Sequence, residues 1–143
     1  MPAIDSISAY ENHIYNLPNE YPHIEYSTLV LKRTGPNVGE VGGTVFFEKN
    51  IRLNVKELID FRRNRIKTYS YEIYVNRDKH YWYDDQPHPD DVSLQSTFPH
   101  HKHIHPDIKH HRISAAGIQF DQSNLPFLVQ EILQTFFPDS LIP

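Results

Sequence analysis

One segment, residues 82–106 (WYDDQPHPDDVSLQSTFPHHKHIHP), concentrates side chains that can do chemistry. It contains four aspartates, five histidines, one lysine and one tyrosine. Histidine accepts and donates protons near neutral pH, and a carboxylate can accept a proton or hold a cation. The density of these groups predicts a catalytic or metal-binding site in this segment.

One chemistry that this set supports is acid–base cleavage of RNA. A neutral histidine would take the proton from a ribose 2′-hydroxyl, and a second group would protonate the leaving oxygen. Lys102 or an arginine would stabilise the charge that develops on the phosphate. The candidate catalytic residues are Asp84, His88, His100, His101, Lys102 and His103. The candidates for substrate binding are Tyr83 and the basic cluster of Arg62, Arg63 and Arg65.

Two other readings of the segment stay open. In a metal-dependent hydrolase, Asp84, His101 and His103 would hold a divalent metal that activates water. Their spacing matches no defined metal motif such as H-E-x-x-H, so no cofactor follows from the residues alone. In a non-enzymatic module, the histidines would lie apart in a solvated loop, and the protein would act by binding a partner.

Length and composition limit the class of protein. The 143 residues suit a single domain, 1–143, with one modest core in which tyrosine and phenylalanine carry much of the burial. The chain has no cysteine, which excludes disulfides and fits a reducing cytoplasm. Its formal net charge of −4 is unlike that of a general nucleic-acid binder. No segment has the composition of a membrane span or a secretory signal, so we expect a cytoplasmic protein.

The hydrophobic pattern predicts an α+β fold. Helical spacing of apolar residues predicts helices at 4–17, where Pro18 would end the helix, and at 125–136. Strand patterns occur at 27–33, 44–48, 51–55, 69–75 and 80–83, and the alternation of two faces is clearest at 69–75. Turns are expected at 49–50 and at 76–78, between consecutive strands. Residues 56–65 fit either a strand or a helix, and Glu57 is expected at a hydrated strand edge. After a proline-rich loop, one short strand is expected near 101–104. Together these elements predict an antiparallel sheet of about five to six strands, with an N-terminal and a C-terminal helix on one face.

Two short blocks within residues 82–106 also resemble a known family. Tyr83 to His88 reads Y-D-D-Q-P-H, and Phe98 to His103 reads F-P-H-H-K-H. This pattern, together with segments 44–58 and 69–75, resembles the TumE family of toxins. The resemblance implies a toxin of a prokaryotic toxin–antitoxin system, encoded near a cognate antitoxin that is often a DNA-binding protein. Asparagine is expected as readily as aspartate at position 85, so the resemblance favours Asp84 as the functional carboxylate.

The resemblance implies no particular reaction and no oligomeric state. Many toxins of this size cleave RNA, so RNA is a possible partner by analogy between toxins. The residues and the resemblance therefore leave three functions open: a ribonuclease, a metal-dependent hydrolase and a module that binds a partner.

Overall fold

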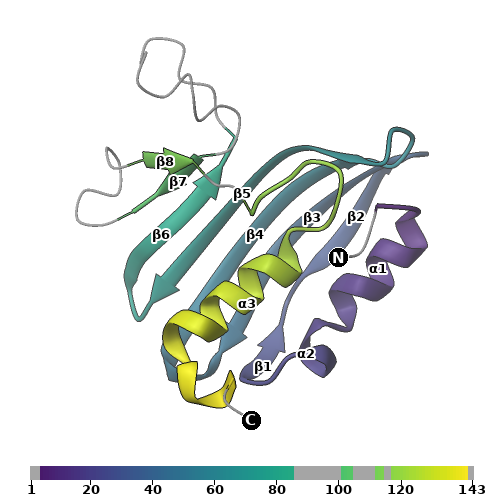
Figure 1. Ribbon diagram of the computed structural model, residues 1–143. Helices are drawn as coiled ribbons and strands as arrows, with labels where there is room; N and C mark the ends of the chain where they lie inside the picture. Colours follow the sequence, from purple (N-terminus) through teal and green to yellow (C-terminus); the bar gives the residue numbers. More distant parts are fainter. Residues whose placement is uncertain (1–3, 86–100, 105–111, 115–116, 142–143) are drawn as a thin grey trace.

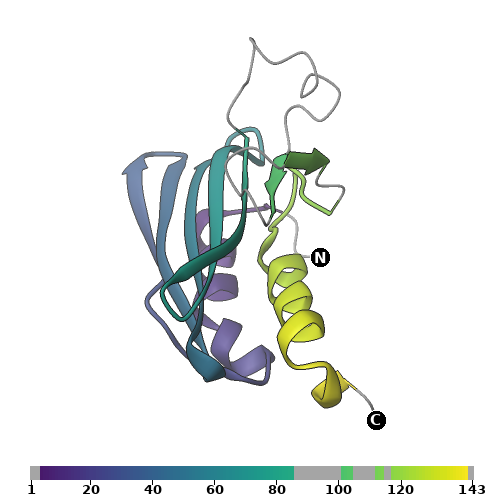
Figure 2. The same cartoon turned by 90° about the vertical axis from the view of Figure 1, so that its left-hand side faces the viewer.

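The computed structural model describes residues 4–85, 101–104, 112–114 and 117–141, and Figures 1 and 2 show its architecture. Its elements in chain order are α1 (Ile7–Tyr15), α2 (Leu17–Glu20), β1 (Ile24–Ser27), β2 (Val30–Gly35), β3 (Val38–Phe47), β4 (Ile51–Asp60), β5 (Arg65–Val75), β6 (Asp78–Asp84), β7 (His101–His103), β8 (Arg112–Ser114) and α3 (Leu125–Phe136). The described strands form one antiparallel sheet in the order β1-β3-β4-β5-β6-β7-β8, and β2 also pairs with β3. This confirms the predicted α+β class, with a helix near each end of the chain.

Alternation along the strands gives the sheet two different faces. On β4 the odd-numbered residues from 51 to 59 are buried, whereas the even-numbered residues from 52 to 58 are half-buried or exposed. The register of β3, β4 and β5 places buried residues of one strand beside buried residues of the next, so each face is continuous across the three strands. Helices α1 and α3 cover the face with the odd-numbered residues of β4 (Figure 2). We call the uncovered face the open face.

A buried carboxylate lies at the centre of the helix-covered face. Glu57 is 3% exposed and accepts hydrogen bonds from the hydroxyls of Tyr10 on α1 (2.7 Å) and Tyr71 on β5 (2.5 Å). The Asn124 side-chain amide donates to the same Tyr71 hydroxyl at 3.1 Å. Burial raises the pKa of Glu57 and of both tyrosines. The expectation of a hydrated Glu57 was wrong because position 57 belongs to the covered face.

The helix boundaries depend on a capping residue and on the position of a proline. Helix α3 matches the predicted range 125–136. The first helix starts later than predicted, because Ser6 caps it by accepting a hydrogen bond from the backbone N–H of Ala9 at 3.1 Å. Pro18 does not end the helical region, since it occupies the first turn of α2, where a proline is tolerated. Within the described ranges even the longest helix, twelve residues in α3, is too short to cross a bilayer.

Residues 56–65, which the sequence left ambiguous, continue β4 and then turn into β5. The predicted turns at 49–50 and 76–78 are confirmed. Lys49, Asn50 and Asn76 adopt φ values of 66°, 59° and 56°, respectively. Asparagine tolerates this left-handed region, so these turns fit their sequence.

Gly43 in the middle of β3 occupies a backbone conformation that other residues rarely adopt. Its φ is 136°, and an added Cβ would lie 2.6 Å from the carbonyl oxygen of Thr28. Thr28 lies between β1 and β2, and its side chain also bonds to β3, because its Oγ1 accepts the backbone N–H of Thr44 at 2.9 Å. Glycine at position 43 therefore allows the edge strands β1 and β2 to approach β3.

Gly43→Ala is expected to lower the free energy of unfolding by at least about 2 kcal/mol, because the left-handed backbone is strained and the clash is with main chain. The adjacent Gly42→Ala is the matched control, since its Cβ would meet no atom within 4 Å. We expect Gly42→Ala to stay within about 0.5 kcal/mol of the wild type in urea denaturation. Equal losses for the two variants would contradict this account of Gly43.

Glu57 should make stability depend on pH. Its pKa is raised in the folded protein, so the folded state binds more protons than the unfolded state above its ordinary pKa of 4.5. The free energy of unfolding should therefore fall as pH rises from 4.5 to the folded-state pKa, by at most about 1.4 kcal/mol per pH unit. Glu57→Gln should remove this dependence, whereas Glu40→Gln, on the exposed side of β3, should keep it. Urea denaturation between about pH 4 and about pH 8 measures the free energy of unfolding. Parallel curves of this free energy against pH for the wild type and Glu57→Gln would refute the role of Glu57.

Candidate active site at the end of strand β6

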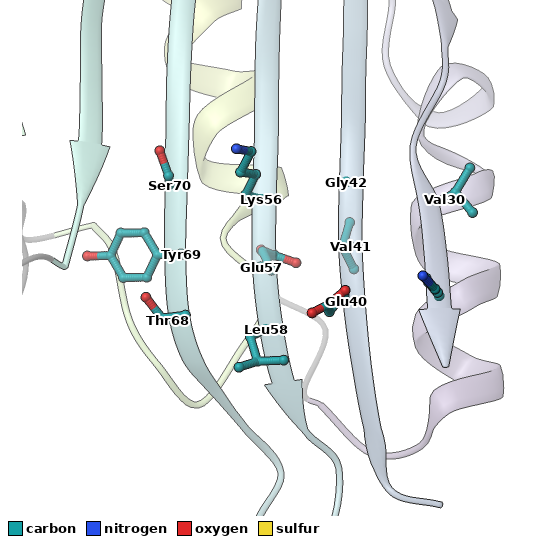
Figure 3. Close-up of a pocket in the computed structure, with 11 residues that line it drawn as sticks. Val30, Glu40, Val41, Gly42, Lys56, Glu57, Leu58, Thr68, Tyr69 and Ser70 are labelled. Atoms are coloured by element: carbon teal, nitrogen blue, oxygen red, sulfur yellow. The ribbon is translucent and has the colours of Figure 1, made fainter. Parts of the chain in front are cut away.

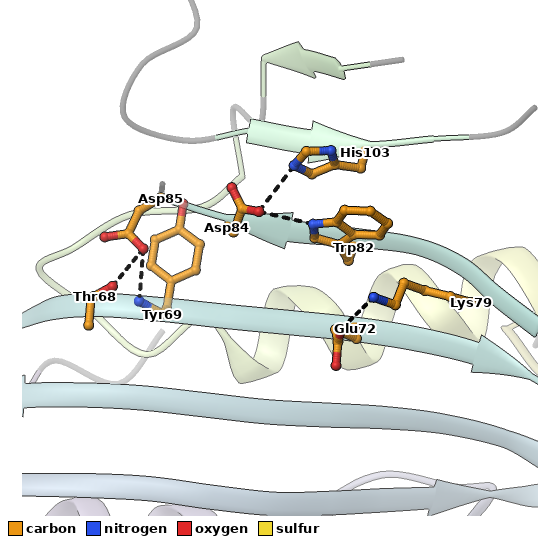
Figure 4. Close-up of polar contacts among 8 residues, drawn as sticks. All are labelled: Thr68, Tyr69, Glu72, Lys79, Trp82, Asp84, Asp85 and His103. Carbon is orange, nitrogen blue, oxygen red and sulfur yellow. Dashed lines mark hydrogen bonds and ion pairs between the residues drawn. The ribbon is translucent and has the colours of Figure 1, made fainter. Parts of the chain in front are cut away.

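The last residue of β6 and the last residue of β7 form the closest acid–base pair among the predicted site residues whose side chains the structure describes. Nε2 of His103 lies 3.1 Å from Oδ2 of Asp84. The indole N–H of Trp82 donates to the same oxygen at 3.0 Å (Figure 4). The rings of Trp82 and His103 stack with centroids 4.2 Å apart and planes at 18°. Antiparallel register explains the meeting, because Trp82 pairs with His103 across the two strands.

This geometry suits proton transfer. A carboxylate that accepts the N–H on one ring nitrogen fixes the tautomer of a neutral imidazole. The Asp84 side chain is 15% exposed and that of His103 only 3%, so Asp84 is the more accessible member of the pair.

Asp85 has a different position from Asp84. One of its oxygens accepts the Thr68 hydroxyl at 2.8 Å and the backbone N–H of Tyr69 at 3.1 Å. These bonds attach the end of β6 to β5, as Figure 4 shows. A carboxylate that holds the backbone in this way needs an oxygen that asparagine also provides, which fits the expected interchange at position 85.

Lys102 and Tyr83 point to the helix side of the sheet. Lys102 Nζ lies 3.2 Å from Oε2 of Glu131 on α3. The Tyr83 hydroxyl donates to the same carboxylate at 2.8 Å, and Tyr83 is 1% exposed. Because neighbouring residues of a strand face opposite sides, Lys102 and His103 lie on different faces of the sheet. The structure therefore does not bring Lys102 to the Asp84–His103 pair.

The basic cluster lies at the turn between β4 and β5. Arg63 forms an ion pair with Asp60 at 2.9 Å, and Asp60 also accepts the backbone N–H groups of Arg62 and Arg63. The hydrogen bond from Arg63 lowers the pKa of Asp60. The guanidinium of Arg65 lies over the ring of Phe120 at 5.3 Å. In Figure 1 this turn lies at the upper right and β7 at the upper left, so the cluster is not beside the pair.

Three predicted residues cannot be placed as side chains. His88 and His100 lie outside the described residues, and His101 is described only through its backbone, which pairs with Asp84 and Ser114. Among the described residues no three potential metal ligands meet. The roles of these histidines, and the metal set of Asp84, His101 and His103, stay predictions.

A hollow of about 690 Å³ lies on the open face, and Figure 3 draws the residues that line it. Gly42, Ser70 and Thr68 are small residues on its floor, and Lys32 and Lys56 supply positive charge. Ser70 pairs directly with Asp84, so the hollow adjoins the carboxylate. This hollow could not be predicted from the sequence, because its residues come from four strands and only the sheet register assembles them.

The comparisons with known proteins give one family. The family described as Toxin TumE matches residues 14–135, a range that holds every predicted site residue. No curated protein and no solved structure matches the chain significantly.

The opposite orientation of Lys102 and Asp84 can be measured by double-mutant cycles. Lys102→Met and Glu131→Gln should be coupled by at least about 0.5 kcal/mol, because the two side chains are in contact. Lys102→Met and Asp84→Asn should be additive within about 0.3 kcal/mol, because the two side chains lie on opposite faces of the sheet. Urea denaturation of the single and double variants gives both values. Coupling of Lys102 to Asp84 as strong as to Glu131 would contradict this arrangement.

Proposed function

The chain belongs to the TumE toxin family, and we propose that it inhibits growth by cleaving RNA at the Asp84–His103 pair. Family membership supports the toxin role and, in general, an antitoxin as partner. The contact of 3.1 Å between the carboxylate and the imidazole carries the proposal of acid–base chemistry. We place this activity in the cytoplasm, where cellular RNA is found, and propose a cognate antitoxin encoded nearby.

In the proposed reaction the pair accepts the proton of a ribose 2′-hydroxyl as that oxygen attacks the adjacent phosphate. Asp84 is the more accessible member of the pair, so its carboxylate takes this proton and becomes a carboxylic acid, while the His103 imidazole holds the carboxyl group in position through the contact at Nε2. The leaving 5′-oxygen needs a second acid, for which His88, His100 and His101 remain the candidates. The imidazole is largely covered, so the substrate must first reach the accessible carboxylate of Asp84.

The hollow beside Asp84 supports RNA as the substrate. Its size lies within the range of small-molecule sites, and it is open enough for part of a polymer. Lys32 and Lys56 would attract phosphate. Glu40 also lines the hollow, and the net charge of the chain is negative, so these lysines supply local rather than general attraction.

The test compares conservative variants of the pair with matched controls on β6. Asp84→Asn and His103→Gln keep hydrogen-bonding groups but cannot exchange protons, so each should reduce RNA cleavage by at least about 100-fold. Asp78→Asn, at the other end of β6, and His80→Gln, on its helix side, should retain activity. Growth on induced expression and the integrity of total RNA measure the effect.

Thermal denaturation must show that the variants are folded. A folded His103→Gln variant that still degrades RNA would reduce the pair to a structural link between β6 and β7. Toxicity of the wild type with intact RNA would refute the ribonuclease proposal while leaving the family assignment in place.

A further inference from the structure

A row of aromatic and cationic side chains crosses the open face away from the hollow. Register places its members opposite one another on consecutive strands: Tyr26, Phe46, Arg52, Tyr74 and Lys79. We call these five residues the aromatic–basic row. The rings of Tyr26 and Phe46 stack with centroids 4.4 Å apart, and the Arg52 guanidinium lies 4.7 Å from the centroid of the Tyr74 ring.

The row joins the candidate active site at one end. Lys79 Nζ lies 4.2 Å from the centroid of the Trp82 ring, and Trp82 stacks on His103. Lys79 also forms an ion pair with Glu72 at 2.6 Å, also drawn in Figure 4. A ligand that follows the row is thereby led to the Asp84–His103 pair.

At the other end the row borders a separate hollow of about 460 Å³. The residues that matter for binding there are Tyr26, Phe46, Asn50, Arg52, Asn76 and Arg77. Two arginines face a single carboxylate, that of Glu25, so the hollow has a local excess of positive charge.

Two features of this end indicate an unfilled binding surface. Tyr26 is 54% exposed, a large fraction for an aromatic ring that already stacks on a neighbour. The Nε atom of Arg52 is buried and has no hydrogen-bond partner among the described residues. A buried donor without an acceptor is unfavourable, so a shift of the Arg52 side chain that lets a ligand's acceptor reach Nε would remove that penalty.

We propose that the Tyr26–Phe46–Arg52 end of the row is a nucleotide subsite that holds single-stranded RNA while the chain is cut at Asp84–His103. The assignment of RNA rests on the proposed function. Bases stack on exposed aromatic rings whatever their sequence, and arginine binds phosphate or a base edge. A four-stranded sheet with such residues holds two or three bases, and this row crosses five strands.

A protein partner is the alternative occupant of this face. Single-stranded RNA fits better, because the cations Arg52 and Lys79 lie between or beside rings along the row and the row continues into the proposed cleavage site. An antitoxin segment would need no such continuity.

Binding can be measured without cleavage. The probe is a labelled, 2′-O-methylated oligonucleotide of about ten nucleotides, which has no free 2′-hydroxyl, and fluorescence anisotropy follows its binding to the full chain. Tyr26→Ala/Phe46→Ala should weaken binding at least about tenfold. Arg52→Gln should also weaken it and reduce the slope of log K against log salt by about 0.7.

The controls are an exposed tyrosine and an exposed arginine away from the row. Tyr15→Ala on α1 and Arg33→Gln, which pairs with Glu11, should bind within about twofold of wild type. Thermal denaturation of each variant shows that its fold is intact.

The outcomes separate the subsite from the proposed function. Row variants that lose binding while Asp84→Asn retains it support the subsite, even if no variant or wild type degrades RNA. Absent binding by the wild type, or row variants that bind normally, would overturn the subsite and leave the RNA-decay test to decide the function. Normal oligonucleotide binding with lost antitoxin capture would assign the row to a protein partner and would also overturn it.

Discussion

The buried carboxylate of Glu57 is the constraint on which the arrangement of layers depends. An ionisable group with 3% exposure needs hydrogen-bond donors from its neighbours. Tyr10 brings a donor from α1 and Tyr71 brings one from β5, while Asn124, just before α3, donates to Tyr71. Both helices are therefore tied to the same face of the sheet. The opposite face is left open, and the candidate site lies on it.

Strand alternation then divides the chemically active segment between two environments. On the covered side, Lys102 and Tyr83 share the carboxylate of Glu131 and attach β6 and β7 to α3. On the open side, Asp84 and His103 meet beside Trp82. Residues that are adjacent in the sequence thus serve different purposes: one set holds the strands in place, and the other is available for chemistry.

The open face has a functional layout that extends beyond the pair. A hollow with two lysines adjoins Asp84 on one side, and the aromatic–basic row reaches Trp82 on the other. An extended polymer could contact several of these features at once, whereas a small metabolite would fill only one. The proposed nucleic-acid ligand is compatible with the net charge of −4, because binding depends on local charge and on stacking as well as on net charge.

Local sequence patterns predicted the α+β class, the range of α3, the alternating faces of β5, the turn at 76–78 and, through the segment 83–103, the family. These features depend on local periodicity, turn residues and motif order, which are written in consecutive residues. The three-dimensional fold was needed to show that Glu57 is buried, that Asp84 contacts His103, and that Lys102 points away from them to Glu131. Those contacts join residues 19 to 47 positions apart. Strand register and helix placement, which arise from packing of the whole chain, determine which of such distant groups meet.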